Sequence, residues 1–207
     1  MNRRDFVSLA GAAGLLPLAA AAAAPVEGKD YTRLGQAVPL AKPGKPEVIE
    51  FFGYWCPHCN EFEPVLDAWV AKLPADVNFR RSPVAWSAMH VPYQKLYFAL
   101  ESLGVPESIH PKVFAAIHVQ GLRFEKEEAV GVFAAANGID KAKLIAAMNS
   151  FTVATDVQRA NQLFAAYSVD GVPTLAVNGR YRTSPSEAGG EQQVLAVVDY
   201  LLRTTKA

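Results

Sequence analysis

Both cysteines of this 207-residue chain lie in one four-residue segment, Cys56-Pro57-His58-Cys59. The segment follows a largely apolar run, residues 48–52, which predicts a buried strand, and the pair Tyr54-Trp55. A disulfide between cysteines this close in sequence closes almost no loop, so it removes little entropy from the unfolded chain. Such a bridge adds little stability but can form and break. The segment therefore predicts a redox-active dithiol at the junction of a strand and a helix.

The residues between the cysteines predict which sulfur reacts. Pro57 suits the first position of a helix, where its missing N–H group costs nothing, and this places Cys56 at the helix N-terminus. The positive end of the helix dipole favours a thiolate there. A partly protonated His58 adds a second favourable charge. We expect Cys56 to be the exposed, attacking sulfur, with a lowered thiol pKa that makes the disulfide form a strong oxidant.

Two other uses of a Cys-x-x-Cys segment fit the sequence less well. A c-type haem site needs a His directly after the second Cys, and Asn60 stands there. A structural zinc site needs about four ligands at compatible spacing. Only the isolated residues His90, His110 and His118 are left to complete one, and we interpret them as surface or hydrogen-bonded residues.

The composition is that of a globular protein, with 51% hydrophobic and 19% charged residues. The 20 basic and 20 acidic residues balance, so the net charge gives no reason to expect a nucleic-acid partner. Because about 100 to 200 residues make a domain, the length fits one domain that carries an insertion.

Residues 1–23 are predicted to be a cleavable export signal rather than part of the fold. Arg3 and Arg4 precede a stretch of Ala, Leu and Gly that ends in small residues, suitable for cleavage after Ala23. A membrane anchor is the alternative, but weakly hydrophobic alanines and three interrupting residues argue against it: Gly11, Gly14 and Pro17. The arginine pair fits a twin-arginine signal and an ordinary secretory signal equally well. Either route leads out of the cytoplasm, where disulfides persist.

The hydrophobic pattern predicts strands at residues 47–52 and 77–81, with a helix between them that begins at Pro57 and is kinked at Pro64. From residue 91 to residue 150 only helical stripes follow, and a longer helix is expected at residues 153–167. Asn178-Gly179 predicts a hairpin between strands at residues 174–177 and 180–183, followed by a last helix at residues 191–203. This order predicts an α/β protein with a helical insertion after its second strand.

Several motifs together resemble the thioredoxin superfamily: Trp55-Cys56-x-x-Cys59, the helix proline Pro64 and the segment Gly171-Val172-Pro173-Thr174. Within it, Cys-Pro-His-Cys, Glu50-Phe51-Phe52, the helical insertion and the Val before the loop proline resemble the DsbA family of thiol:disulfide oxidants. The resemblance extends from about residue 30 to the end of the chain. It implies a thioredoxin-like fold from residues 24–84 and 151–207, with an inserted all-helical subdomain at residues 85–150.

The resemblance also implies roles for residues outside the dithiol. It implies that Val172-Pro173 is a cis peptide that lies against the dithiol and binds substrate, whereas the residues alone favour an ordinary trans proline before a hairpin strand. It implies that Glu50 lies beneath the active site and moves protons; a solvated glutamate at a sheet edge is the alternative. Arg81 stands where relatives carry a lysine. Because arginine does not give up its proton, the proton path is left open, while a charge-pairing role remains.

The function implied is that of a periplasmic dithiol oxidase, which donates the Cys56-Cys59 disulfide to newly exported proteins through a mixed disulfide at Cys56. Catalytic roles are implied for Cys56, Pro57, His58, Cys59 and Glu50. A membrane quinone oxidoreductase of the DsbB type is the implied reoxidising partner, and we expect a monomer with no metal and no organic cofactor. A disulfide isomerase or reductase, and a metal-binding or chaperone module, are the alternatives that a redox titration separates.

Overall fold

The structure is a computed structural model that describes residues 23–205 of the chain. The predicted export signal, residues 1–23, lies outside this range except for its last residue, so its prediction is not tested here. Among the helices of the described range, none is both long enough and apolar enough to cross a bilayer.

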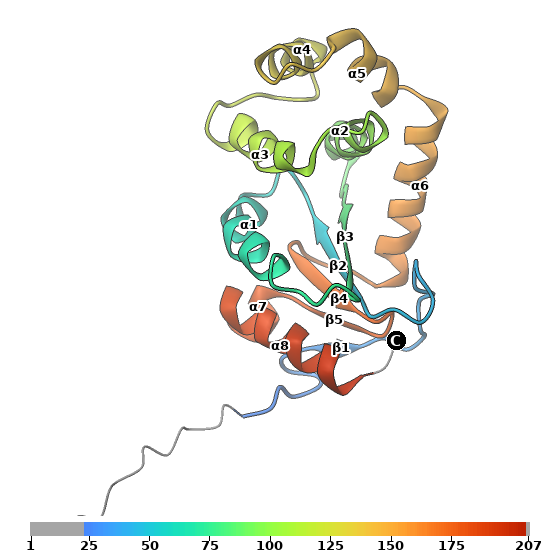
Figure 1. Cartoon of the computed structure of the whole chain (residues 1–207), viewed down its shortest axis with the longest axis vertical. Coiled ribbons are helices and arrows are strands. Elements are labelled where there is room, and N and C mark those ends of the chain that lie inside the picture. Colours follow the sequence, from blue (N-terminus) through green and yellow to red (C-terminus); the bar gives the residue numbers. More distant parts are fainter. Residues whose placement is uncertain (1–22, 206–207) are drawn as a thin grey trace, which may run out of the picture.

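A five-stranded mixed sheet forms the centre of the fold, in the order β1-β5-β4-β2-β3 (Figure 1). Its strands are β1 (Thr32–Arg33), β2 (Glu47–Phe52), β3 (Asn78–Pro83), β4 (Thr174–Val177) and β5 (Tyr181–Thr183). Strand β2 pairs in parallel with β3 and antiparallel with β4, so both of its edges are covered. Every residue of β2 is buried, which explains why its sequence is almost continuously apolar.

The hairpin between β4 and β5 is confirmed. Asn178 and Gly179 have positive φ angles of 50° and 67°, and the Arg180 N–H group donates a hydrogen bond to the Val177 carbonyl. Because Val177 pairs with Tyr181, the connection is one residue longer than the predicted two-residue turn. A Cβ atom at Gly179 would also collide with the carbonyl oxygen of Val38, so glycine is the residue that fits this turn.

Helices cover both faces of the sheet (Figure 1). Helix α1 (Pro57–Val70), which contains Pro64, and helix α8 (Glu191–Thr204) share an apolar core with one face, and the short α7 (Pro185–Ala188) precedes α8. Helix α6 (Phe151–Ala166) lies against the other face and packs on β3. Successive side chains of β2 point to opposite faces of the sheet. Val48 therefore belongs to the first core, and Ile49 and Phe51 belong to the second.

The helical region predicted between residues 91 and 150 is confirmed, and Figure 1 shows it above one end of the sheet. It consists of α2 (Val91–Ser102), α3 (His110–His118), α4 (Glu127–Ala136), α5 (Lys141–Met148) and the two 3-10 turns η1 (Ala88–His90) and η2 (Glu107–Ile109). Helix α6 also packs on α2 and α5 and so joins this region to the sheet. The apolar core of the region is continuous with Phe52, Tyr54 and both cysteines, so the dithiol lies where the insertion meets the sheet.

Candidate active site

Cys56 is the residue immediately before helix α1, as the sequence predicted. It is the N-cap of the helix, with φ −86° and ψ 120°, and Pro57 occupies the first helical turn. Its N–H group donates a hydrogen bond to the Gly53 carbonyl 2.9 Å away, which closes the turn between β2 and α1. A Cβ atom at Gly53 would lie 2.6 Å from the ring of Trp55, so the turn has room for the indole only with glycine there.

The two thiols are unbridged, and the structure is that of the reduced dithiol. We expected Cys56 to be the exposed sulfur, and this expectation needs correction because only 5% of Cys56 is exposed. The half-buried side chains of Trp55 and Val172 pack against the apolar cluster that includes it. Cys59 has no exposed surface at all. Cys56 is therefore the more accessible of the two, although both are buried.

The Cys56 thiol is much more acidic than an ordinary cysteine. Its pKa is lowered from 9.0 to about 6, with the hydrogen bond from the Cys59 side chain as the largest contribution. Burial acts in the opposite direction, and hydrogen bonds from the backbone N–H groups of Cys59 and His58 lower the pKa further. These N–H groups belong to the first turn of α1, so the predicted effect of the helix N-terminus is present in this form.

Cys59 has the opposite character. Burial raises the pKa of its thiol, and the hydrogen bond to Cys56 and the charges on Cys56 and Glu50 raise it further. At neutral pH the reduced dithiol therefore holds a thiolate at Cys56 and a protonated thiol at Cys59.

His58 contributes less to the acidity of Cys56 than we expected. The charge on its imidazole is the smallest of the five effects on the Cys56 pKa. Its side chain is 78% exposed, and Nδ1 lies 3.1 Å from a carboxylate oxygen of Glu61. The position explains the difference, because water and a neighbouring carboxylate both weaken the field that the ring exerts on the sulfur.

The other three histidines all have partners, as predicted. His90 stacks on Trp55 with 3.9 Å between ring centroids and accepts a hydrogen bond from the Trp86 N–H group. His118 Nε2 lies 2.8 Å from the Tyr54 carbonyl oxygen, and His110 belongs to the buried network described below. Within residues 23–205, no three His, Cys, Asp or Glu side chains form a group suited to a metal ion.

The peptide bond between Val172 and Pro173 is cis, and it lies against the dithiol as the resemblance implied. Cys56 Sγ is 3.5 Å from the Val172 carbonyl oxygen, so a loop 116 residues away forms one wall of the site. A groove of about 390 Å³ runs from this loop to the start of α8. It is lined by twelve residues, among them His58, Phe62, Val172, Pro173, Ser184 and Glu191.

Glu50 is fully buried in the central strand β2, which excludes the alternative of a solvated glutamate at a sheet edge. It stands opposite Arg81 in the register of β2 and β3, and Arg81 Nε donates a hydrogen bond to Glu50 Oε2 over 3.0 Å. The contact agrees with the charge-pairing role left open for Arg81. Burial, and then the charge of Glu63, raise the pKa of Glu50 well above its ordinary value, although Arg81 acts in the opposite direction.

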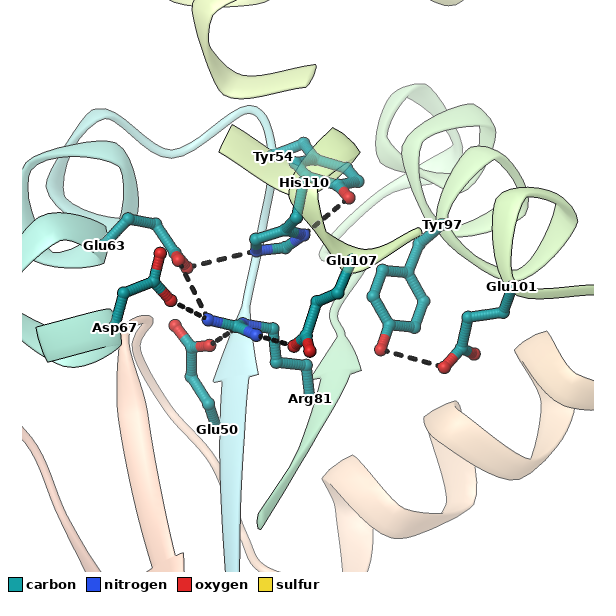
Figure 2. A network of polar contacts seen from close by, with 9 residues as sticks. All are labelled: Glu50, Tyr54, Glu63, Asp67, Arg81, Tyr97, Glu101, Glu107 and His110. Carbon is teal, nitrogen blue, oxygen red and sulfur yellow. Dashed lines mark hydrogen bonds and ion pairs between the residues drawn. The ribbon is translucent and has the colours of Figure 1, made fainter. Parts of the chain in front are cut away.

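Sequence reasoning missed the rest of the network around Arg81, which Figure 2 shows. The guanidinium group also contacts Glu63 at 3.1 Å and Asp67 at 2.6 Å from helix α1, and Glu107 from η2. Glu63 continues the chain of contacts to His110 and Tyr54. One signal was present: Glu63 lies on the apolar side of α1, between Phe62 and Leu66, where an acidic residue needs a partner. No local pattern marks His110 or Glu107.

Comparison with known proteins assigns this arrangement to a family. A family model described as "DSBA-like thioredoxin domain" matches residues 87–201, and one described as "Thioredoxin" matches residues 36–90. The "Thiol:disulfide interchange protein DsbA" of Pseudomonas aeruginosa is 40% identical over 207 residues, which cover 100% of this chain and 98% of that protein. The protein of the same name from Bordetella pertussis is 42% identical over 205 residues, 98% of both chains.

Solved structures agree with the sequence relatives. The crystal structure of Pseudomonas aeruginosa DsbA is similar with a TM-score of 0.83 at 41% identity, over 86% of this chain and 93% of that one. The oxidoreductase DsbA from Xylella fastidiosa is similar with a TM-score of 0.80 at 34% identity, over 86% and 96%. The expected α/β, thioredoxin-like fold is thereby confirmed. The chain belongs to the DsbA family of thiol:disulfide oxidoreductases.

Proposed function

We propose that this chain is a thiol:disulfide interchange oxidase that donates the Cys56-Cys59 disulfide to newly exported proteins. The observation that supports this most directly is the lowered pKa of Cys56, about 6, beside a Cys59 whose pKa is raised. A thiolate that is stable in the reduced protein makes the disulfide form a strong oxidant, because reduction gains the stabilisation of that thiolate.

The reaction proceeds in two thiol–disulfide exchanges. A substrate thiolate attacks Cys56 Sγ, the Cys56–Cys59 bond breaks, and Cys59 leaves as a thiolate that takes up a proton. A second substrate thiolate then attacks the substrate sulfur of the mixed disulfide, and Cys56 leaves as a thiolate. Two electrons pass from the substrate to the dithiol, and the substrate gains one disulfide. The low pKa of Cys56 makes it a good leaving group in the second step.

The remaining site residues serve these two steps. The groove beside Val172-Pro173 opens next to Cys56, and the backbone there suits an extended substrate segment. Pro57 starts the helix without an unpaired N–H group, and His58, at the rim of the groove, adds a weak favourable charge for the thiolate. Glu50 supplies the proton to Cys59, since its raised pKa favours the protonated carboxyl group.

Location and partners follow from family membership and from the sequence before the fold. We place the protein in the periplasm, because the arginine pair and the Ala-rich stretch of residues 1–23 have the character of an export signal. Its partners there are reduced proteins with pairs of cysteines. The reduced dithiol must lose two electrons after each cycle, and a membrane quinone oxidoreductase of the DsbB type suits this role.

One set of measurements tests the proposal. The mature chain is equilibrated with reduced and oxidised glutathione, and its ability to form the disulfide of a reduced two-cysteine peptide is followed. We expect an oxidising equilibrium and rapid transfer, with Cys59→Ser trapping the mixed disulfide and Cys56→Ser forming none. A reducing equilibrium would favour a reductase or isomerase, and stoichiometric zinc or copper binding without thiol exchange would favour a metal carrier.

A further inference from the structure

The buried face of the dithiol holds more carboxylates than its one cation can balance. Arg81 contacts Glu50, Glu63, Asp67 and Glu107 (Figure 2). The side chains of Asp67 and Glu107 are 49% and 79% exposed, so water stabilises their charges. Those of Glu50 and Glu63 are 0% and 5% exposed, and one arginine balances only one of them. The second buried carboxyl group therefore favours its protonated form unless a further donor stabilises its charge.

Hydrogen bonding decides which of the two carries the charge. Both oxygens of Glu63 have partners, Arg81 at 3.1 Å and His110 Nε2 at 3.2 Å. Glu50 has only the bond from Arg81, and its Oε1 has no partner within the described part of the chain. Because donors stabilise a carboxylate, Glu63 is the ionised group and Glu50 holds the proton. The pKa directions agree: burial raises that of Glu63, but His110 and Arg81 outweigh it and the net shift is downward.

The orientation of His110 is fixed from its other side. Its Nδ1 lies 2.7 Å from the buried Tyr54 hydroxyl group, and its ring packs edge-on against Phe52 and Phe114. Burial raises the pKa of Tyr54 well above its ordinary value, so the hydroxyl group keeps its proton and forms a hydrogen bond with Nδ1. Because a carboxylate oxygen can only accept a hydrogen bond, the imidazole carries a proton on Nε2, which it donates to Glu63. The contacts form one chain from Tyr54 through His110, Glu63 and Arg81 to Glu50.

We infer that His110 is a positioning residue for the redox reaction, which holds Glu63 ionised against Arg81 and thereby keeps the proton that Cys59 needs on Glu50. His110 starts helix α3, so the inserted helical region controls a step that takes place in the thioredoxin-like part. The inference rests on the proposed function, in which Cys59 leaves as a thiolate and is protonated. In this arrangement Glu50 supplies the proton and Arg81 balances the charge of Glu63. An arginine can therefore stand at position 81, because it does not have to give up a proton.

The sign of the effect follows from the chain of contacts. Without the donor at His110, Glu63 becomes easier to protonate, and Arg81 then pairs with Glu50. The Glu50 carboxyl group loses its proton at a lower pH, and less acid is available to Cys59 near neutral pH. The groups that titrate or carry charge around this pair come from α1, β3, the β2–α1 turn, η2, α3 and α2: Cys59, Asp67, Arg81, Tyr54, Glu107, His110, Tyr97 and Glu101.

A pair of amide variants separates the two hydrogen bonds of His110. The Gln amide in His110→Gln reaches about as far as Nε2 and retains a donor for Glu63, whereas the shorter amide in His110→Asn reaches only about as far as Nδ1, toward Tyr54. His118→Asn is the matched control, because His118 lies in the same helix and contacts only the Tyr54 carbonyl among the bonds described. Circular dichroism and thermal unfolding establish that each variant is folded.

The first readout is the rate at which the oxidised enzyme reacts with a reduced two-cysteine peptide, from about pH 5 to about pH 9. The ratio of variant to wild-type rate at each pH cancels the ionisation of the peptide. For His110→Asn we expect this ratio to fall at least about tenfold between the acidic and the alkaline end. We expect His110→Gln and His118→Asn to give flat ratios. Glu63→Gln should reproduce His110→Asn, and the double variant should add nothing further.

The second readout does not depend on activity. Carbon-13 NMR of the glutamate carboxyl groups, assigned with Glu50→Gln and Glu63→Gln, should show Glu63 titrating below the ordinary range and Glu50 above it. In His110→Asn the two should move toward each other. Unchanged titrations, or a rate ratio for His110→Asn that is flat with pH, would overturn the inference. A wild-type enzyme that oxidises no peptide would instead refute the proposed function, and the carboxyl titrations would still judge the charge arrangement.

Discussion

The two cysteines are two positions apart, but the structure treats them in opposite ways. Around Cys56 the Cys59 thiol and the N–H groups of the first helical turn lower the pKa to about 6, and the Val172 carbonyl lies 3.5 Å from the sulfur. Around Cys59 the setting is apolar burial above a cluster of charged side chains, and its pKa is raised. The attacked sulfur therefore depends on groups of its own helical turn, the Cys59 thiol first and the backbone N–H groups after it. The buried sulfur depends on burial and on the charges of Cys56 and of Glu50 in strand β2.

The largest effect is expected on the buried side, where Arg81→Met should lower the free energy of unfolding by about 3–5 kcal/mol. The variant leaves the ionised Glu63 in the interior without its cation. Denaturant unfolding of the reduced protein at neutral pH measures the loss. Arg182→Met is the matched control: its partner Asp170 is 77% exposed, so that change should cost less than about 1 kcal/mol. Equal losses of unfolding free energy in the two variants would show that the contacts of Arg81 contribute no more to stability than an exposed ion pair.

The next prediction tests how strongly the Cys59 side chain controls the pKa of Cys56. The Cys59 thiol is the largest cause of the low pKa of Cys56, so Cys59→Ala should raise that pKa by at least about one unit from its value near 6. In Cys59→Ser the hydroxyl group replaces the donor, and the pKa should stay lower than in the alanine variant. Ultraviolet absorbance of the thiolate against pH measures both. The same midpoint in both variants would show that the backbone alone stabilises the thiolate.

A third effect links the reactive side to folding. Because the pKa of Cys56 is depressed in the folded, reduced protein, the thiolate stabilises that state above the unfolded pKa and loses this effect as pH falls through about 6. The disulfide form has no such group. The stability of the reduced form relative to the oxidised form should therefore increase by about 2 kcal/mol between about pH 5 and about pH 8. Urea unfolding of both forms measures it, and a difference that is constant with pH would contradict the assignment.

The surroundings of Cys56 were largely predicted from the sequence, and those of Cys59 largely were not. The strand, the turn and the helix that place Cys56 are local, and so is the turn at Asn178-Gly179; their patterns predicted them directly. The cis bond before Pro173 was predicted only through the resemblance to a family. The place of Glu50 beneath the active site was likewise predicted through that resemblance.

The parts that were missed depend on contacts between distant segments. Tyr54 and His110 are 56 residues apart, and Arg81 and Glu107 are 26 residues apart. No periodicity or motif connects such pairs before the chain is folded. The burial of Cys56 was not predicted, although the resemblance placed Val172, from a loop 116 residues away, against the dithiol. His58 was overrated because a sequence shows that a charge is near but not that water and Glu61 screen it.

His58 is also where the smallest effect is expected, and it tests whether side-chain charge contributes on the reactive side at all. His58→Ser should raise the pKa of Cys56 by about half a unit or less, because the imidazole is 78% exposed and its charge is the weakest of the contributions. Glu61→Gln removes the carboxylate 3.1 Å from the ring and should lower the same pKa slightly. The glutathione equilibrium should move in opposite directions in the two variants, by less than about 30 mV each, and high salt should reduce both shifts. A shift of several units in His58→Ser would place the imidazole, rather than the Cys59 thiol and the helix N–H groups, at the centre of the thiolate's stability. The conclusion that the Cys59 thiol and the helix N–H groups stabilise the Cys56 thiolate would then have to be abandoned.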